Sequence, residues 1–307
     1  MICAPVALFV YNRPWHTRQT VEALLANAEA ADTDLYIFSD AAKNEQADMA
    51  VSEVRSYIHG ITGFISVHII EREANFGLAK SIIEGVSLIC KQHGQVIVLE
   101  DDMVTSPYFL KFMNDGLEFY ENDERVISIS GYVYPIKKSL PETFFLRGAD
   151  CWGWATWKRG WELFEQDGQY LLEELTRKKL ADKFDFDNSY PYMKMLRAQI
   201  AGKNNSWAIR WYASAFLKNK LTLYPGKSLV RNIGMDDSGT HCSSAVAHEV
   251  DLARALVRVG TVPVEESTSA RQAFVAFHLK SRTNVFAKAY RRLAAAVQRR
   301  VGYSESK

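Results

Sequence analysis

Strand and helix signals alternate along the first 130 residues, and this alternation restricts the fold more than any other feature. Apolar strand runs occupy residues 6–11, 35–38, 65–70, 96–99 and 126–130. Between them, apolar spacing predicts helices from Pro14, from about Glu45 to Ile58, after Gly77, and from Pro107 to Tyr120. Such alternation is typical of βαβ units and a sheet covered on both faces. We therefore expect an α/β fold with a mostly parallel, Rossmann-like sheet.

Polar residues follow four of these strand runs at the point where each run ends. They are Asn12-Arg13, Ser39-Asp40, Glu71-Arg72 and Glu100-Asp101-Asp102. The carboxyl ends of parallel strands lie on one edge of the sheet, and ligands bind beyond that edge. The sequence therefore predicts that these four clusters converge on one binding site.

Three adjacent acids, Glu100, Asp101 and Asp102, form the cluster with the clearest chemistry. Burying them without compensation is costly, and a divalent cation removes that cost. Mg²⁺ and Mn²⁺ take one or two carboxylates and complete their shell with water and substrate phosphates. The alternative is a solvated acidic loop, but the neighbouring polar clusters favour a Mn²⁺ or Mg²⁺ site that a nucleotide diphosphate completes.

Other strand ends supply candidate donor-binding residues. Arg13 suits bidentate contacts to phosphate or a base, with a surface ion pair as the alternative. Asp40 would accept a hydrogen bond from a base or ribose, or would cap a helix instead. Asn75 begins Asn-Phe-Gly ahead of a helix whose N-terminus would receive an anion.

The second half of the chain is rich in aromatic residues and offers two further candidate segments. Trp152-Gly153-Trp154 follows Asp150; tryptophan stacks on sugar rings and Gly153 would let a ligand approach the backbone, with core packing as the alternative. A polar loop from Asn232 to His241 carries Asp236 and Asp237. His241 is a candidate metal ligand there, although a lone histidine is more often structural. Helices are predicted near 170–184, 191–201 and 207–219, and a strand near 221–224.

Taken in order, these segments resemble the nucleotide-sugar-dependent glycosyltransferases of the GT-A fold. The chain resembles the bacterial branch related to family 2 transferases and, more distantly, N-acetylglucosaminyltransferase I, over residues 4–243. The segments that carry the resemblance are Val10-Tyr11-Asn12-Arg13-Pro14, Phe38-Ser39-Asp40, Asn75-Phe76-Gly77-Leu78-Ala79, Leu99-Glu100-Asp101-Asp102-Met103, Gly131-Tyr132, Cys151-Trp152-Gly153-Trp154 and Asn232-Ile233-Gly234.

The resemblance implies a role for most of these residues. It implies that Arg13 and Asp40 bind the nucleotide and that Asp102 binds the metal. Glu100 and Asp101 would contact the ribose or the donor sugar, and Trp152-Gly153-Trp154 would contact the donor and acceptor sugars. It also implies inverting transfer, with a carboxylate as general base. Where N-acetylglucosaminyltransferase I relatives carry that base, this chain has Trp207-Ala208-Ile209-Arg210-Trp211, which contains no acid. Asp236, Asp237 and Asp150, in that order, are the candidate bases.

Charge is divided unequally between the body and the C-terminal end of the chain. Residues 280–307 hold eight Lys or Arg against one acid, Glu305, a charge of about +7. Because the whole chain has a net charge of +1, residues 1–279, the body, carry about −6. An acidic body disfavours nucleic-acid binding. The tail places Phe286, Tyr290, Leu293, Val297 and Val301 on one helical stripe with basic residues opposite. It would dock on an anionic membrane surface or pack on its own domain.

We therefore expect residues 1–243 to form the transferase domain, with a nucleotide half to about 135 and an acceptor half from about 136. Residues 244–307 would form a helical extension. The predicted activity is metal-dependent transfer from a nucleotide sugar, with UDP favoured by the resemblance, to a glycan, lipid-linked or lipopolysaccharide acceptor in cell-surface polysaccharide biosynthesis. Scattered cysteines and a start without a secretory signal predict a cytoplasmic protein, peripheral at the inner face of the membrane. A non-catalytic sugar-nucleotide or glycan binder and a sugar nucleotidyltransferase are the alternatives.

Overall fold

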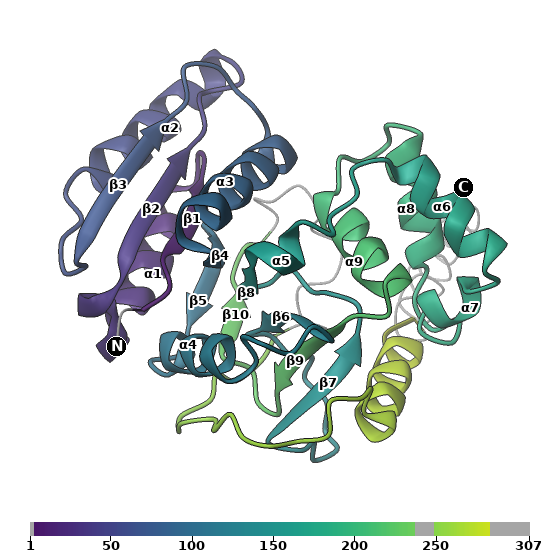
Figure 1. The fold of residues 1–307 in the computed structure, drawn as a ribbon. Coiled ribbons are helices and arrows are strands. Elements are labelled where there is room, and N and C mark those ends of the chain that lie inside the picture. Colours follow the sequence, from purple (N-terminus) through teal and green to yellow (C-terminus); the bar gives the residue numbers. More distant parts are fainter. Residues whose placement is uncertain (1–2, 237–248, 283–307) are drawn as a thin grey trace, which may run out of the picture.

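An eight-stranded mixed sheet runs through the computed structural model, which describes residues 3–236 and 249–282 (Figure 1). Most of its strands point in one direction, and β8 and β7 run against the others. In spatial order the strands are β3 (Ser66–Glu71), β2 (Asp34–Ser39), β1 (Val6–Val10), β4 (Gln95–Glu100), β8 (Trp154–Trp157), β6 (Val126–Ser130), β9 (Leu221–Pro225) and β7 (Thr143–Arg147). The predicted α/β class with a mostly parallel sheet is confirmed.

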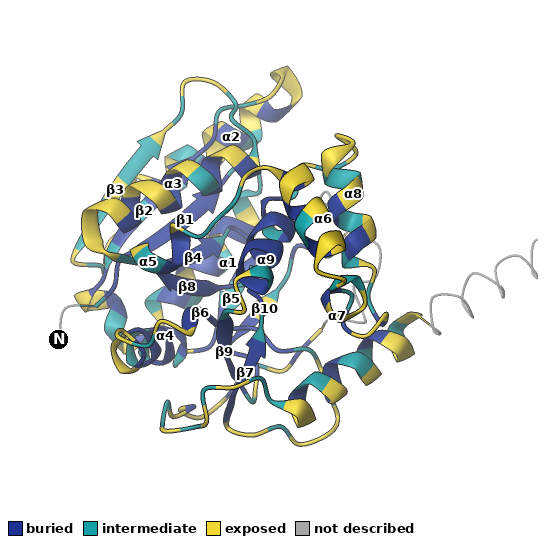
Figure 2. Ribbon diagram, turned by 45° about the vertical axis from the view of Figure 1, so that its right-hand side comes forward, coloured by how far each residue is buried: buried dark blue, intermediate teal, exposed yellow. Residues whose placement is uncertain are grey.

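Alternating side chains of the central strands divide the core between the two faces of the sheet. Val6, Leu8 and Val10 of β1 pack on one face, whereas Ala7 and Phe9 pack on the other. This period of two is what a strand buried on both faces requires. Figure 2 shows the resulting burial: the central strands are dark blue, the edge strand β3 is mostly teal, and helices such as α2 are exposed on their outer sides.

Helices cover both faces, as the sequence predicts. On the Val6 face lie α1 (Pro14–Leu25), α2 (Glu45–Ile58) and α4 (Phe109–Phe119). On the Ala7 face lie α3 (Leu78–His93), α5 (Lys158–Trp161) and α9 (Trp207–Leu217). A third core lies under α6 (Gly168–Arg177), α7 (Ala181–Phe184), α8 (Tyr192–Ile200) and the helical residues 268–282. The short helix η1 (Ala28–Asp32) precedes β2.

Residues 170–184, predicted as one helix, form two helices instead. Between α6 and α7, Lys179 has φ of 55°, a left-handed conformation that ends a helix. The short strands β5 (Met103–Thr105) and β10 (Val230–Asn232) were not predicted from the sequence, and together they form a separate antiparallel pair. This pair brings two distant segments together beside the end of β4.

Segments 249–267 and 268–282 pack on the sheet rather than apart from it. Glu266 forms a β-bridge with Phe145, and Phe274 lies buried in the third core. The tail stripe from Phe286 to Val301 lies outside the described residues. Across the part of the chain that is described, no helix combines the length and the apolar character needed to cross a membrane.

Candidate functional site

The carboxyl ends of β1, β2, β3 and β4 meet at one edge of the sheet. The parallel register aligns Phe9 with Glu100, Val10 with Ser39, and Ser39 with Glu71. The polar clusters that follow these strands therefore lie along one edge, as the sequence predicts (Figure 1). This edge is the candidate functional site.

Arg13 is bound to two of the three acids at this edge. It follows β1 at the start of α1, and its Nη2 donates to Asp102 Oδ2 at 2.9 Å and to Asp101 Oδ1. Burial lowers the pKa of the guanidinium, but the charges of Asp101 and Asp102 outweigh burial and raise that pKa overall. Arg13 therefore forms the ion-pair alternative considered above, in a partly buried setting where one cation balances two carboxylates.

The three acids carry more negative charge than Arg13 neutralises. Burial raises the pKa of Glu100 to about 8, with the charges of Asp102 and Asp101 adding to the effect. Burial also raises the pKa of Asp101 to about 6, against the opposing charge of Arg13. Both shifts mean that the folded site disfavours this many carboxylates in their charged form.

Asp102 Oδ1 is buried and has no hydrogen-bond partner among the described residues. An unpartnered buried carboxylate oxygen is costly unless a cation or donor reaches it. Within residues 3–236 and 249–282, no three His, Cys, Asp or Glu side chains group so as to hold a metal ion by themselves. Asp102 fits a Mg²⁺ or Mn²⁺ site of few protein ligands, whose remaining ligands come from substrate and water. His241 lies outside the described residues.

The β5–β10 pair places the Asn232–Asp236 segment directly over Asp102. Asn232 pairs with Met103, and the backbone N–H of Ile233 donates to the carbonyl of Asp102 at 2.9 Å. A Cβ atom at Gly234 would lie 2.0 Å from Asp102 Oδ2 and 2.6 Å from Arg13 Nη1. Only glycine fits against this ion pair, so the second half of the chain closes over the acids of the first half.

His16 is a residue at this site that the sequence analysis missed. It lies three residues after Arg13 on α1, and its Nε2 is 3.0 Å from Asp236 Oδ2. His16 is buried, whereas the side chain of Asp236 is 45% exposed. The spacing of three residues from Arg13, one helical turn, was the signal available for finding it. Asp237 lies outside the described residues.

Asp40 orders the loop before α3, but it is not the N-cap residue of a helix: Asn44 precedes α2 and Gly77 precedes α3. Oδ1 of Asp40 accepts from the backbone N–H groups of Ala41 and Phe76, at 2.9 and 2.8 Å. Its Oδ2 accepts from Gly77 N at 2.8 Å and Asn75 Nδ2 at 3.1 Å. Asp40 therefore holds the two residues that lead into α3, where an external anion was expected.

Asp150 lies on the same side of the sheet edge as the acids. Because β8 runs against β4 and Trp154 pairs with Val98, the residues before β8 adjoin those after β4. The electrostatics agree: burial raises the pKa of the Cys151 thiol, and the charges of Asp150, Glu100 and Asp102 all add to that rise.

The Asp150 carboxylate bonds to a tyrosine hydroxyl and interacts electrostatically with two further tyrosines. Its Oδ1 accepts from Cys151 N at 2.7 Å, and its Oδ2 accepts from Tyr224 Oη at 3.4 Å. Burial raises the pKa of Asp150, and the hydrogen bonds only partly oppose this rise. The Asp150 charge in turn adds to the rise that burial causes in the pKa values of Tyr132 and Tyr134.

Of the tryptophans Trp152, Trp154 and Trp157, only Trp152 is partly exposed. Trp152 is half-buried, and its ring meets Tyr132 edge-on at 4.6 Å between centroids. Trp154 is fully buried and stacks on Trp207 at 5.5 Å. Gly153, with φ of +59°, packs so closely that a Cβ atom would lie 2.6 Å from Val230 Cγ2. Its lack of a side chain is explained by internal packing.

The Trp207–Trp211 segment begins α9 and lies in the core. Arg210 Nη1 donates to the carbonyl of Gln166 at 3.2 Å, and its Nε donates to Ser206 O at 3.3 Å. Burial lowers the pKa of this guanidinium. Arg210 therefore ties two segments together, and this stretch supplies no general base.

No protein-family model matches the sequence, and no curated protein matches it either. Solved structures with a similar arrangement include Staphylococcus aureus TarS, 12% identical over 50% of this chain with a TM-score of 0.34, and its fragment 1–349, 11% identical over 74% with a TM-score of 0.40. The matches span 28% and 59% of those chains.

A third similar structure is the mannosyltransferase PcManGT from Pyrobaculum calidifontis, in complex with GDP-Man and Mn²⁺. It is 12% identical over 71% of this chain and 70% of its own, with a TM-score of 0.41. None of these similarities bears on the resemblance to N-acetylglucosaminyltransferase I. At such scores they support no inference about activity, and the α/β class rests on the sheet of this chain itself.

Proposed function

We propose that this protein is a glycosyltransferase that moves a sugar from a nucleotide-sugar donor to an acceptor hydroxyl. The observation that carries the proposal is the group of three acids at the carboxyl edge of the sheet, with Asp102 Oδ1 buried and unpartnered among the described residues. This is the edge where α/β sheets bind ligands, and the acids there carry more charge than Arg13 balances.

Asp102 would hold a Mn²⁺ or Mg²⁺ ion, and Glu100 would contact the ribose or the donor sugar. The bound ion supplies charge neutralisation for the departing nucleoside diphosphate. Arg13 and Asp101 would contact the donor beside it, and Asp40 would act by holding Asn75, Phe76 and Gly77 in one conformation. Trp152 would lie against a sugar ring.

Asp150 is the general base that the geometry supports best. Its raised pKa makes it a better proton acceptor near neutral pH than an ordinary aspartate. Asp236 is half exposed, and its carboxylate already contacts His16 Nε2 at 3.0 Å. The order of the candidate bases is therefore changed, with Asp150 first, then Asp236; Asp237 lies outside the described residues.

The proposed step is one displacement at the anomeric carbon with inversion. The acceptor oxygen forms a bond to that carbon while the bond from the carbon to the diphosphate oxygen breaks. The acceptor proton moves to Asp150, and the electron pair of the broken bond leaves with the diphosphate. UDP as the nucleotide and a glycan or lipid-linked acceptor at the inner face of the membrane remain part of the proposal.

The test is thermal stability against UDP-, GDP-, CMP- and dTDP-sugars, each with and without Mn²⁺. A ligand at about 100 times its dissociation constant adds about 2.7 kcal/mol to the unfolding free energy, enough for a shift of several degrees. We expect a Mn²⁺-dependent shift with one nucleotide class, lost in Asp102→Asn and kept in Asp182→Asn. Asp182, exposed on α7, is the matched control.

Three other outcomes would contradict the proposal. If no nucleotide sugar raises the melting temperature, the chain has no donor site. Donor binding without turnover, tested with a panel of saccharide acceptors, would indicate the non-catalytic binder. Pyrophosphate release from a nucleoside triphosphate and a sugar phosphate would indicate the nucleotidyltransferase.

A further inference from the structure

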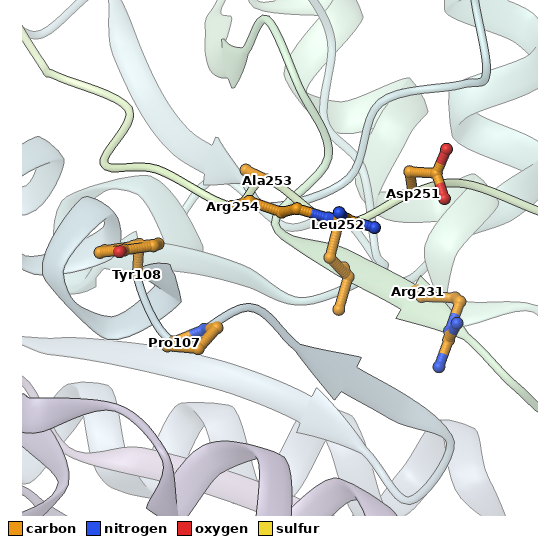
Figure 3. A pocket seen from close by; sticks show the side chains of 7 residues that line it. All are labelled: Pro107, Tyr108, Arg231, Asp251, Leu252, Ala253 and Arg254. Carbon is orange, nitrogen blue, oxygen red and sulfur yellow. The ribbon is translucent and has the colours of Figure 1, made fainter.

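Two adjoining grooves lie along residues 249–254. The first has a volume of about 430 Å³ and the second about 520 Å³, and both are lined by Asp251, Leu252 and Arg254. Figure 3 shows the first groove: Arg254 and Asp251 come from segment 249–254, Arg231 from β10, and Pro107 and Tyr108 from the turn after β5. Volumes of this size are typical of sites for small ligands.

Four cationic side chains line these grooves, and we call them the basic trough: Lys137, Lys227, Arg231 and Arg254. Two carboxylates, Glu249 and Asp251, lie beside them. None of the four cations makes an ion pair or a side-chain hydrogen bond with another described residue. By contrast, Arg271 pairs with Asp187 and Glu266. The trough is therefore a locally positive surface on a body whose net charge is about −6.

The basic trough reaches both halves of the candidate site. At one end Arg231 precedes Asn232, and the segment from Asn232 onward covers Asp102. At the other end the second groove is lined by Tyr134, whose ring lies 5.4 Å from that of Tyr132. Tyr132 in turn contacts Trp152, and Asp150 acts on both tyrosines electrostatically. The trough therefore borders the segment that covers Asp102 at one end and a tyrosine beside Tyr132 at the other.

We propose that the basic trough binds a phosphate group of the acceptor, so that the acceptor is a phosphorylated saccharide or a diphosphate-linked one. This inference rests on the proposed glycosyltransferase function. Arginine suits phosphate because its planar fork donates two parallel hydrogen bonds to phosphate oxygens.

Phosphate binding in the trough differs from donor binding in its dependence on a metal ion. Donor phosphates require the cation at Asp102, because the acids there repel anions. Phosphate in the trough requires no metal ion, since its charge is met by Arg231, Arg254, Lys137 and Lys227. The two sites are therefore distinguishable by chelation.

The experiment is titration calorimetry of the full chain with inorganic phosphate in the presence of EDTA. We expect binding that weakens at least ten-fold in the double variant Arg231→Gln/Arg254→Gln and is unchanged in Arg258→Gln. Arg258 is exposed and does not line either groove, so it is the matched control. The pair Lys137→Gln/Lys227→Gln tests the second groove in the same way. Circular dichroism verifies that each variant is folded.

Two further arms identify the source of the phosphate. Stronger binding of pyrophosphate than of dimethyl phosphate indicates a diphosphate-linked acceptor, and the reverse order indicates a phosphodiester within a glycan. Equal phosphate binding by the unmodified chain and both double variants overturns the proposal. So does a double variant that loses binding of a nucleotide sugar with Mn²⁺, because the arginines then belong to the donor site. Failure of donor binding in the unmodified chain contradicts the proposed function alone, since the phosphate titration needs neither donor nor metal.

Discussion

Gly234 lies against Asp102 so closely that a Cβ atom on the glycine would come within 2.0 Å of Asp102 Oδ2. The contact joins the loop after β10 to the acids after β4, two segments that are far apart in the sequence. Because Arg13 Nη1 lies 2.6 Å from the same position, the loop cannot accept a side chain without moving the ion pair.

We predict that Gly234→Ala weakens donor binding by at least ten-fold and lowers the unfolding free energy by about 1–3 kcal/mol, the usual cost of overpacking. Gly260→Ala is the control, because a Cβ atom there meets nothing within 4 Å. Denaturant unfolding and a nucleotide-sugar titration measure the two effects. Equal behaviour of the two variants would show that the loop does not rest on Asp102.

Arg13→Met is expected to lower the unfolding free energy by about 3–5 kcal/mol, because it leaves buried carboxylates without their partner. Mn²⁺ should recover part of this loss by neutralising the same acids. Arg13→Lys, which keeps one charge, should lose less than Arg13→Met. Chemical denaturation with Mn²⁺ or with EDTA measures all three; a Met variant as stable as the unmodified chain would contradict the ion pair.

Asp150→Asn should lower kcat by about 10²- to 10⁴-fold, the usual range for loss of a general base, while donor affinity stays unchanged. Asp236→Asn should cost much less. Steady-state kinetics and donor titration separate the two effects. A large loss in Asp236→Asn with a small loss in Asp150→Asn would reverse the assignment of the base.

The pH dependence of the rate follows from the raised pKa of Asp150. A general base must be unprotonated to accept a proton, so the rate should rise with pH as Asp150 loses its own. Because burial raises this pKa, the rise should be centred above about 4, the value of an ordinary aspartate. The profile of kcat/KM against pH tests this, and a rate independent of pH from 4 to 7 would contradict it.

His16 and Asp236 should be energetically coupled. Each of His16→Ala and Asp236→Ala removes the same 3.0 Å contact, so their effects on stability should not add. Residues in direct contact show interaction energies of about 0.5–3 kcal/mol in double-mutant cycles. The cycle is measured by denaturant unfolding of the two single variants and the double variant, and additive effects would show that the contact is not formed.

Much of the sheet was predictable, because buried strands and amphipathic helices leave strong periodic patterns. The four polar strand ends met at one edge as expected, since a parallel register requires it. Contacts between residues far apart in the sequence were harder to predict. Nothing local in Val230–Asn232 indicates a strand paired with Met103–Thr105, because three residues carry no measurable period. The β5–β10 pair nevertheless determines what covers Asp102.

The roles of several residues could not be predicted from their type, because the roles depend on what packs against them in the fold. Gly153 was expected to face a ligand, but the space beside it holds Val230. Trp154 and Trp157 belong to a buried strand, although their spacing in the sequence equally suits a sugar platform. The sequence could not decide whether Arg13 contacts a phosphate or forms an ion pair. The structure shows the ion pair, because the acids after β4 lie beside the end of β1.

The carboxylate of Asp40 has a consequence for how a ligand would meet this protein. It accepts hydrogen bonds from the backbone N–H groups of Phe76 and Gly77, just before α3. The loop is thus ordered when the chain folds, so ligand binding does not have to supply the free energy for ordering it. A ligand that binds at this edge would therefore contact a loop whose conformation is already set by Asp40.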